Sequence, residues 1–164
     1  MKKRNAYLLL LMIALLLLDQ GTKILVEKNL DLLESIEIIE GFFSITYICN
    51  TGAAWSILEG KMVFFYVITI IAIIGLCLYF TTLKQYQILA QIGIAMSLAG
   101  AIGNFIDRLA FQYVRDFLDF IIFGYDFPVF NVADSCLCIG IAFIIIDEIM
   151  DQLGIVVWKK ETKK

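Results

Sequence analysis

The stretch that decides the fold covers residues 62–83 and reads MVFFYVITIIAIIGLCLYFTTL. It contains no charged side chain, and residues 85–107 are also uncharged up to the last of them, Asp107. As α-helices, both stretches are long enough to cross the ~30 Å hydrocarbon core of a bilayer. They therefore predict two membrane-spanning helices that are joined by a short turn at Lys84.

The composition supports a membrane protein. Of its 164 residues, 61% are hydrophobic and only 18% are charged, which excludes an ordinary soluble domain. The chain has one proline, no histidine and no stretch rich in Ser or Gly that would indicate a linker. We therefore expect a single domain that covers residues 1–164.

Two further stretches, residues 6–26 and 130–150, have the length of a span but contain acidic residues. The segments between spans, 27–61 and 108–129, contain alternating apolar and polar residues typical of short strands in the first and of an interfacial helix or strand in the second. The predicted fold is an all-α membrane protein with four transmembrane helices, a small extracytoplasmic β-rich segment and an interfacial loop or helix.

The distribution of charge predicts the orientation. In a four-span arrangement, one side carries the basic residues, namely Lys2, Lys3, Arg4, Lys84, Lys159, Lys160, Lys163 and Lys164. The loops and helix ends of the other side contain mainly Asp and Glu. Because basic residues are enriched on the cytoplasmic side of membrane proteins, both termini are predicted to be cytoplasmic.

Several acidic residues lie near the outer boundary of the membrane in this arrangement. The helical rise places Asp19 and Asp134 about 20 Å from the charged residues at the cytoplasmic side of their spans, and Asp107 about 35 Å from Lys84. An ionised group at hydrocarbon depth costs at least ~2.5 kcal/mol, so each needs a partner or a function. Arg108, the next residue in the sequence, can neutralise Asp107.

Asp19 and Asp134 also have positions that suit a structural role. Asp19 and Lys23 have the i, i+4 spacing of an intrahelical ion pair, with the acid first. Asn131 has the position of a helix N-cap, and Asp134 lies three residues later, where a carboxylate favours the positive end of a helix. The spacing alone does not separate these roles from chemistry.

The residue types restrict the chemistry that this chain can perform. Without histidine, and with no lysine expected beside a serine, a hydrolytic site has only carboxylates to use. Two aspartates that share a site can act as acid and base, and asparagine amides can donate to a developing oxyanion. A small four-span transporter or cation pathway is the alternative, because intramembrane acids serve there as well.

Five sequence blocks occur at the outward ends of the four predicted spans. They are DQGTK at 19–23, NTGAAW at 50–55, GAIGNFIDR at 100–108, VRDF at 114–117 and FNVADS at 130–135. In these blocks, and in their order, the chain resembles the lipoprotein signal peptidases (signal peptidase II), a family of aspartic peptidases. The resemblance extends over nearly the whole chain.

The resemblance implies an endopeptidase of the bacterial cytoplasmic membrane whose active site lies near the outer face. Such an enzyme removes the signal peptide from diacylglyceryl-modified prolipoproteins, just before the lipid-bearing cysteine. It uses two aspartates and a water molecule, with neither a metal nor a cofactor. Its partners are the precursor and membrane lipid rather than nucleic acid, and it functions as a monomer.

The resemblance also assigns roles to residues. By position in the motifs, Asp116 and Asp134 would form the catalytic pair. The supporting or substrate-binding residues would be Asn50, Gly52, Asn104, Asp107, Arg108 and Asn131, while Asp19 and Lys23 would hold the first helix. Asp119, three residues after Asp116, is the second candidate for the catalytic role of Asp116.

Overall fold

A computed structural model of the protein describes residues 2–52 and 60–155. Trp55 of the NTGAAW block and the four predicted cytoplasmic lysines after residue 155 lie outside these residues. In chain order the elements are α1 (Lys2–Asn29), β1 (Ser35–Ile39), β2 (Phe43–Asn50), α2 (Met62–Thr82), α3 (Ile88–Phe111), β3 (Val114–Ile122), β4 (Tyr125–Phe130) and α4 (Val132–Gln152).

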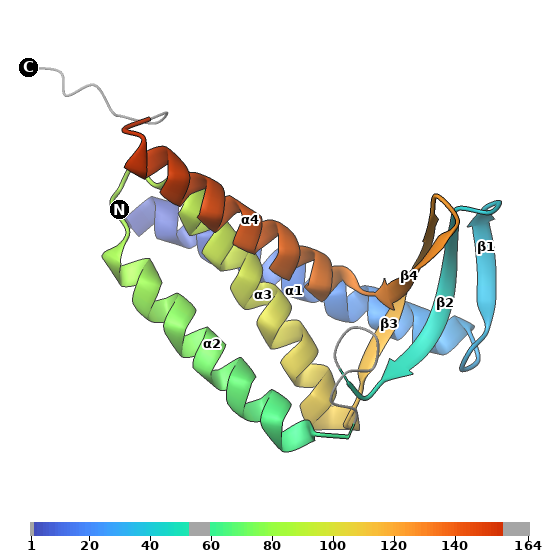
Figure 1. Ribbon diagram of the computed structural model, residues 1–164. Coiled ribbons are helices and arrows are strands. Elements are labelled where there is room, and N and C mark those ends of the chain that lie inside the picture. Colours follow the sequence, from blue (N-terminus) through green and yellow to red (C-terminus); the bar gives the residue numbers. More distant parts are fainter. Residues whose placement is uncertain (1, 53–59, 156–164) are drawn as a thin grey trace, which may run out of the picture.

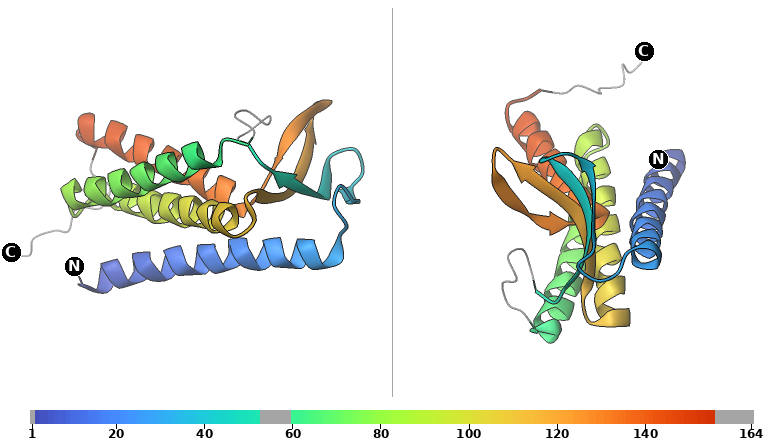
Figure 2. Two further views of the ribbon diagram at one scale, coloured as in Figure 1. Left: turned by 90° about the horizontal axis from the view of Figure 1, so that it is seen from below. Right: turned by 90° about the vertical axis from the view of Figure 1, so that its right-hand side faces the viewer.

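The helices form one elongated bundle, and the strands form a sheet at one end of it (Figure 1). The start of α1 and the end of α4 lie at the opposite end of the bundle, as Figure 2 shows in two further views. Helix α3 is central, because it contacts α1, α2 and α4 and contains most of the buried helical residues. The bundle therefore has one end that carries the sheet and an opposite end at which α1 begins and α4 ends.

The surface of the bundle is apolar. Helix α2 exposes Val63, Ile71 and Leu78 by more than half, and Phe65 is its only buried residue among those described. In the described part of the chain, three helices are long and apolar enough to cross a membrane, namely Arg4–Asn29, Met62–Thr82 and Ile88–Phe111. Helices α1 and α2 are apolar and have little buried surface, which is typical of helices surrounded by lipid.

Helices α3 and α4 pack closely through glycine. A Cβ atom at Gly93 would lie 2.5 Å from the carbonyl oxygen of Gly140, and one at Gly140 would lie 2.6 Å from the carbonyl oxygen of Gly93. At Gly100 a Cβ would collide with the backbone of Ala133. Small residues at helix contacts let two backbones approach in a membrane, where packing rather than the hydrophobic effect holds helices together. The start of α4 is thereby fixed against α3.

The strands form one antiparallel sheet in the order β1-β2-β3-β4. Strands β1 and β2 confirm the strands predicted within residues 27–61. Of the alternatives predicted for residues 108–129, the strand is confirmed and the loop or helix is wrong, since Val114–Ile122 and Tyr125–Phe130 are strands of the same sheet. The local sequence fits both a helix and a strand, and β2 favours the strand by offering an edge on which β3 pairs.

The β3–β4 hairpin reverses the chain between Asp116 and Asp134. Its turn places Phe123 and Gly124 at φ values of 51° and 78°. Positive φ at both central residues matches the twist of a two-residue hairpin, and glycine adopts it at little cost. Pro128 lies in β4, which is an edge strand, where its missing N–H is tolerated.

We predict that Gly140→Ala separates α3 from α4 and lowers the free energy of unfolding by about 1–3 kcal/mol, because the new methyl group collides with backbone. Gly75→Ala on α2 is the matched control, since nothing lies within 4 Å of a Cβ at that position. Thermal melts followed by circular dichroism in detergent would compare the two variants. Equal melting temperatures would contradict the proposed close contact.

Candidate active site

Polar side chains from four elements meet where the helix bundle joins the sheet. Asn50 ends β2, Asn104 lies on α3 and Asp116 lies on β3. Asn131 and Asp134 begin α4. The sequence separates the first and last of these residues by more than eighty positions, and the β3–β4 hairpin together with the α3–α4 contact brings them together.

The local structure at the start of α4 fixes two of these residues. Asn131 is the N-cap, and its Oδ1 accepts the backbone N–H of Asp134 at 3.0 Å. In return, Oδ2 of Asp134 accepts the backbone N–H of Asn131 at 3.2 Å. This reciprocal capping box satisfies two N–H groups that a helix start leaves unpaired. The predicted cap is confirmed, and it holds the Asp134 carboxylate in one orientation.

Within residues 2–52 and 60–155, each oxygen of the two carboxylates accepts a hydrogen bond. Nδ2 of Asn50 donates to Oδ2 of Asp116 at 2.8 Å, and Nδ2 of Asn131 donates to Oδ1 of Asp116 at 2.6 Å. On Asp134, Nδ2 of Asn104 donates to Oδ1 at 2.7 Å, while Oδ2 takes the backbone N–H described above. Asn131 therefore contacts both carboxylates, one through its side chain and the other through its backbone.

The environment of Asp116 favours its protonated form. The side chain is 2% exposed. Burial, and after it the negative charge of Asp134, raise the pKa of Asp116 to about 7, although the hydrogen bonds from Asn50 and Asn131 oppose the shift. A neighbouring pair in which one carboxyl keeps its proton near neutral pH is the arrangement that acid and base catalysis by two aspartates requires.

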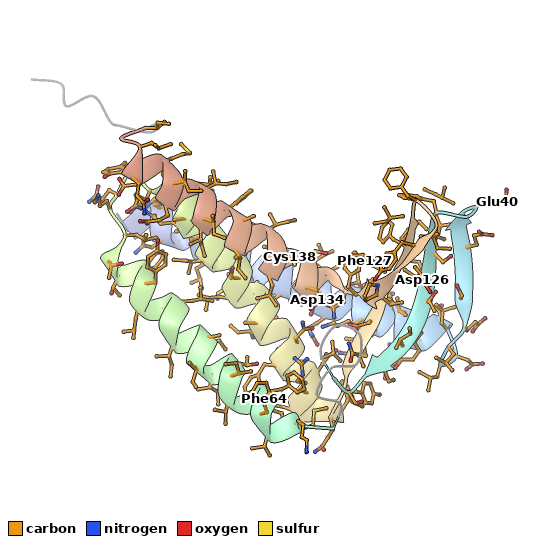
Figure 3. All side chains as sticks on the ribbon, in the orientation of Figure 1. Glu40, Phe64, Asp126, Phe127, Asp134 and Cys138 are labelled. Atoms are coloured by element: carbon orange, nitrogen blue, oxygen red, sulfur yellow. The ribbon has the colours of Figure 1, made fainter. Side chains whose placement is uncertain are left out.

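The two carboxylates line one cavity of about 450 Å³. Figure 3 shows Asp134 at the junction of helices and sheet, with Phe127 and Cys138 close by. The cavity is lined by Asn50, Gly52, Asn104, Arg108, Val114, Asp116, Phe127, Pro128, Val129, Phe130, Asp134, Ser135 and Cys138. It combines a polar floor with an apolar wall from β4, so it can hold an extended peptide that carries an apolar group.

Arg108 lies on the wall of this cavity. Its guanidinium lies 4.5 Å from the ring of Phe65 on α2 and donates to the carbonyl oxygen of Gly52 at 3.2 Å. The backbone carbonyl of Arg108 accepts a hydrogen bond from Tyr66 at 2.9 Å. Arg108 thus connects α3 with Phe65 on α2 and with Gly52, which lies two residues after β2. Asp107 has a different partner.

A second polar cluster lies behind the carboxylates. Nζ of Lys23 lies 3.0 Å from Oδ2 of Asp19, which confirms the predicted i, i+4 ion pair, and 3.4 Å from Oδ2 of Asp107. All three side chains are buried. Asp19 also accepts the backbone N–H of Ala133 at 2.9 Å. The pair therefore joins the first helix to α3 and to the start of α4.

The partner of Asp107 differs from the one that the sequence indicated. Arg115, not Arg108, neutralises Asp107: its NH2 atom donates to Oδ1 at 2.7 Å, and its Nε and backbone N–H donate to Oδ2. Side chains one position apart on a helix point in different directions, so Arg108 faces the cavity while Asp107 faces β3. Arg115 also contacts Glu27 and Gln20.

The prediction of site residues missed Arg115, Gln20 and Glu27. Nε2 of Gln20 donates to both Asp19 and Asp107, so this side chain connects the two buried acids. The sequence offered a weak signal for Gln20 and Arg115, because they lie inside the DQGTK and VRDF blocks. Glu27 stands outside every block, and only the fold places it beside Arg115.

Asp119 lies apart from the cavity. Its Oδ2 accepts the hydroxyl of Thr46 at 2.5 Å, and it is absent from the residues that line the cavity. Residues three apart on a strand point to opposite faces, although a bulge in β2 lies opposite this part of β3. The geometry thus favours Asp116 over Asp119 as the partner of Asp134. Among the described residues, no group of three His, Cys, Asp or Glu side chains is arranged to hold a metal ion.

The fold and the site together define a class of protein. Helices that are long and apolar enough to cross a membrane carry, at one end, two aspartates that accept hydrogen bonds and line one cavity of about 450 Å³. Such a pair suits a membrane-embedded hydrolase of the aspartic type.

Comparison with known proteins identifies the family. The family model for signal peptidase (SPase) II matches residues 11–150. The lipoprotein signal peptidase of Staphylococcus haemolyticus (strain JCSC1435) is 50% identical over 143 residues, which cover 87% of this chain and 90% of the relative. That of Staphylococcus aureus (strain JH9) is 46% identical over 143 residues, which cover 87% of this chain and 88% of the relative.

Solved structures share the fold of this chain. A bacterial membrane enzyme determined by the in meso method at 2.3 Å resolution has a TM-score of 0.86 and 44% identity, covering 96% of this chain and 95% of the other. A second, at 1.9 Å resolution, has a TM-score of 0.81 and 45% identity, covering 89% of this chain and 94% of the other. This chain belongs to the signal peptidase II family, and it is accordingly an aspartic peptidase of the bacterial cell membrane.

The raised pKa of Asp116 predicts how stability changes with pH. Because the folded-state pKa of about 7 lies above the ordinary value of 3.8, the contribution of protonated Asp116 is complete below about pH 4 and is lost as the pH rises through about 7. Asp116→Asn cannot ionise, so at pH 8 it should exceed the wild type in unfolding free energy by about 1–3 kcal/mol. Thermal melts at pH 5 and pH 8 would measure the gap, and an equal gap at both values would contradict the prediction.

Proposed function

We propose that this chain removes the signal peptide from diacylglyceryl-modified prolipoproteins by hydrolysing the peptide bond just before the lipid-bearing cysteine. The observation that carries the proposal is the pair Asp116 and Asp134, joined through Asn131 in one cavity at the end of the bundle. Membership of the signal peptidase II family supports the same activity. It does not favour the transporter or cation pathway.

In the proposed reaction, one carboxyl group acts as the base and the other as the acid. With one proton between them, the ionised group takes a proton from water, and the protonated group polarises the carbonyl of the bond to be cleaved. The hydroxyl adds to the carbonyl carbon, and the resulting tetrahedral intermediate collapses as the leaving amine takes up a proton. Asn50, Asn104 and Asn131 hold the carboxylates at fixed angles, which keeps this step preorganised.

Roles for the other cavity residues follow from their positions. We assign Asn50 and Gly52 to the backbone of the substrate, because both line the cavity beside Asp116. Arg108 lies on the same wall and holds Gly52 in place. Asp107 lies outside the lining of the cavity and anchors β3 through Arg115. Asp19 and Lys23 hold the first helix.

We also propose that all four helices span the membrane as one domain, with both termini cytoplasmic and the site near the outer face. Helix α4 has 21 residues, about 31 Å of helix, although it carries more acids than an ordinary span. The start of α1, the end of α4 and the α2–α3 turn with Lys84 lie at the end of the bundle opposite the sheet (Figure 1). We propose a monomer as the functional unit, because a single chain forms a cavity that contains both Asp116 and Asp134.

A cleavage assay tests the assignment of the pair. Asp116→Asn and Asp134→Asn should each lower the rate constant kcat for a lipidated precursor by at least about 1,000-fold, because either change removes one of the two roles. Asp119→Asn is the matched control on the same strand and should retain most of the activity. Wild-type turnover by either well-folded variant of the pair would reject the assignment.

The same assay tests whether cleavage requires the lipid modification of the precursor and whether it requires a metal ion. The diacylglyceryl-modified precursor should be cleaved much faster than its unmodified form, and a chelator should leave the rate unchanged. Equal cleavage of both precursors would remove the lipid requirement while leaving the peptidase activity intact.

Reporter fusions test the proposed orientation. Green fluorescent protein should fluoresce when it is fused after residue 164, because it folds in the cytoplasm. Alkaline phosphatase, which is active only outside, should be active when it is inserted in the β3–β4 turn at Gly124. The reverse pattern would place the sheet and the site on the inner face.

A further inference from the structure

Lys23 lies between the buried charge cluster and the two carboxylates of the site. Its side chain is 0% exposed. Besides its ionic contacts with Asp19 and Asp107, Nζ donates a hydrogen bond to Oδ1 of Asn104 at 3.0 Å. An ion pair that served only to hold helices together would not need this third contact with a neutral side chain that lines the cavity.

The contact determines which way the Asn104 amide points. An amide group has one accepting atom and one donating atom, whereas a lysine ammonium can only donate. The atom that faces Lys23 must therefore be Oδ1, which leaves Nδ2 to face Asp134, where it donates at 2.7 Å. Nδ2 of Asn131 also donates to the same Oδ1, at 3.1 Å.

We propose that Lys23 is a positioning residue for the hydrolysis, whose ammonium fixes the Asn104 amide so that its Nδ2 donates to Asp134. The inference rests on the proposed function and goes beyond the role of Lys23 in holding the first helix. Lys23 acts through Asn104 and touches neither carboxylate of the pair at hydrogen-bonding distance in the contacts described.

Other contacts already hold α1 in place. Asp19 accepts the backbone N–H of Ala133 on α4, and Gln20 donates to the carbonyl oxygen of Gly103 on α3. Asp107 has Arg115 as a partner on both of its oxygens. Without Lys23, Asn131 alone would face Oδ1 of Asn104. Rotation of the amide would then turn a carbonyl oxygen toward Asp134, which repels an ionised carboxylate.

The charge of Lys23 also reaches the pair. The charged groups around it are Asp19 on α1, Asp107 on α3 with Arg115 of β3 behind it, and, farther away, Asp134 on α4 and Asp116 on β3. The positive charge of Lys23 holds the pKa of Asp116 lower than burial alone would set it. Loss of that charge should therefore move the acidic limb of the pH–rate profile to higher pH.

The test compares three variants in the precursor-cleavage assay. Lys23→Met removes the ammonium and retains a long side chain. Lys28→Met is the matched control on the same helix, because Lys28 is exposed. Asp19→Asn combined with Lys23→Met removes one buried anion together with one buried cation, so it restores the charge balance without restoring the contact with Asn104.

We expect Lys23→Met to lower kcat by about 10- to 100-fold with KM within about twofold, and to shift the acidic limb to higher pH. Lys28→Met should match the wild type. The double variant should regain the melting temperature that Lys23→Met loses, while its kcat stays low because the contact with Asn104 is still missing.

Two results would overturn the inference. If kcat recovers together with the melting temperature in the double variant, Lys23 serves only stability. If Lys23→Met retains wild-type kcat and an unshifted pH profile, the Asn104 amide does not need it. A wild-type protein that leaves the precursor uncleaved would instead reject the proposed function itself, so the two failures are distinguishable.

Discussion

Four charged side chains are buried together where the bundle meets the sheet, and their mutual neutralisation is the constraint on which the rest of the structure depends. Asp19 and Asp107 supply two negative charges, and Lys23 and Arg115 supply two positive charges. An isolated charge in this environment would cost several kcal/mol, and removing one partner leaves the other uncompensated. The four residues come from α1, α3 and β3, so the cluster can form only when these elements have docked.

This balance has a consequence for the pair Asp116 and Asp134. Lys23 and Arg115 already have anionic partners, so neither of them is available to neutralise the pair fully. Arg108 lies on the cavity wall but is engaged with Phe65 and Gly52. Asparagine amides, which are neutral, supply the hydrogen bonds instead. Two buried carboxylates with neutral donors retain a proton more readily than two carboxylates with cationic partners.

Hydrophobic periodicity and contacts between nearby residues were readable from the sequence. The uncharged stretches predicted the central helices, the alternation in residues 35–47 predicted β1 and β2, and the Asp19–Lys23 spacing predicted an ion pair that is confirmed. The N-cap at Asn131 followed from residue type and position. These features depend on neighbours within a few residues, which is the range over which a sequence pattern carries information.

The remaining features depend on tertiary pairing. Residues 114–122 fit a helix or a strand, and the choice was made by β2, which lies more than sixty residues away. The partner of Asp107 was wrong for a related reason, because Arg108 is adjacent in sequence while Arg115 approaches only after β3 turns back along the bundle. The separation of Asp116 from Asp119 needed the residues of the cavity wall. None of these contacts can be read from the spacing of neighbouring residues in the sequence.

The capping box of α4 links the completion of folding to the appearance of activity. Asn131 and Asp134 stabilise the first turn of the last helix, and the same two side chains shape the site. A nascent chain that has inserted its first three helices therefore has Asp116 but lacks the other carboxylate and its cap. Such an intermediate has no competent acid–base pair, so activity depends on the docking of the last helix.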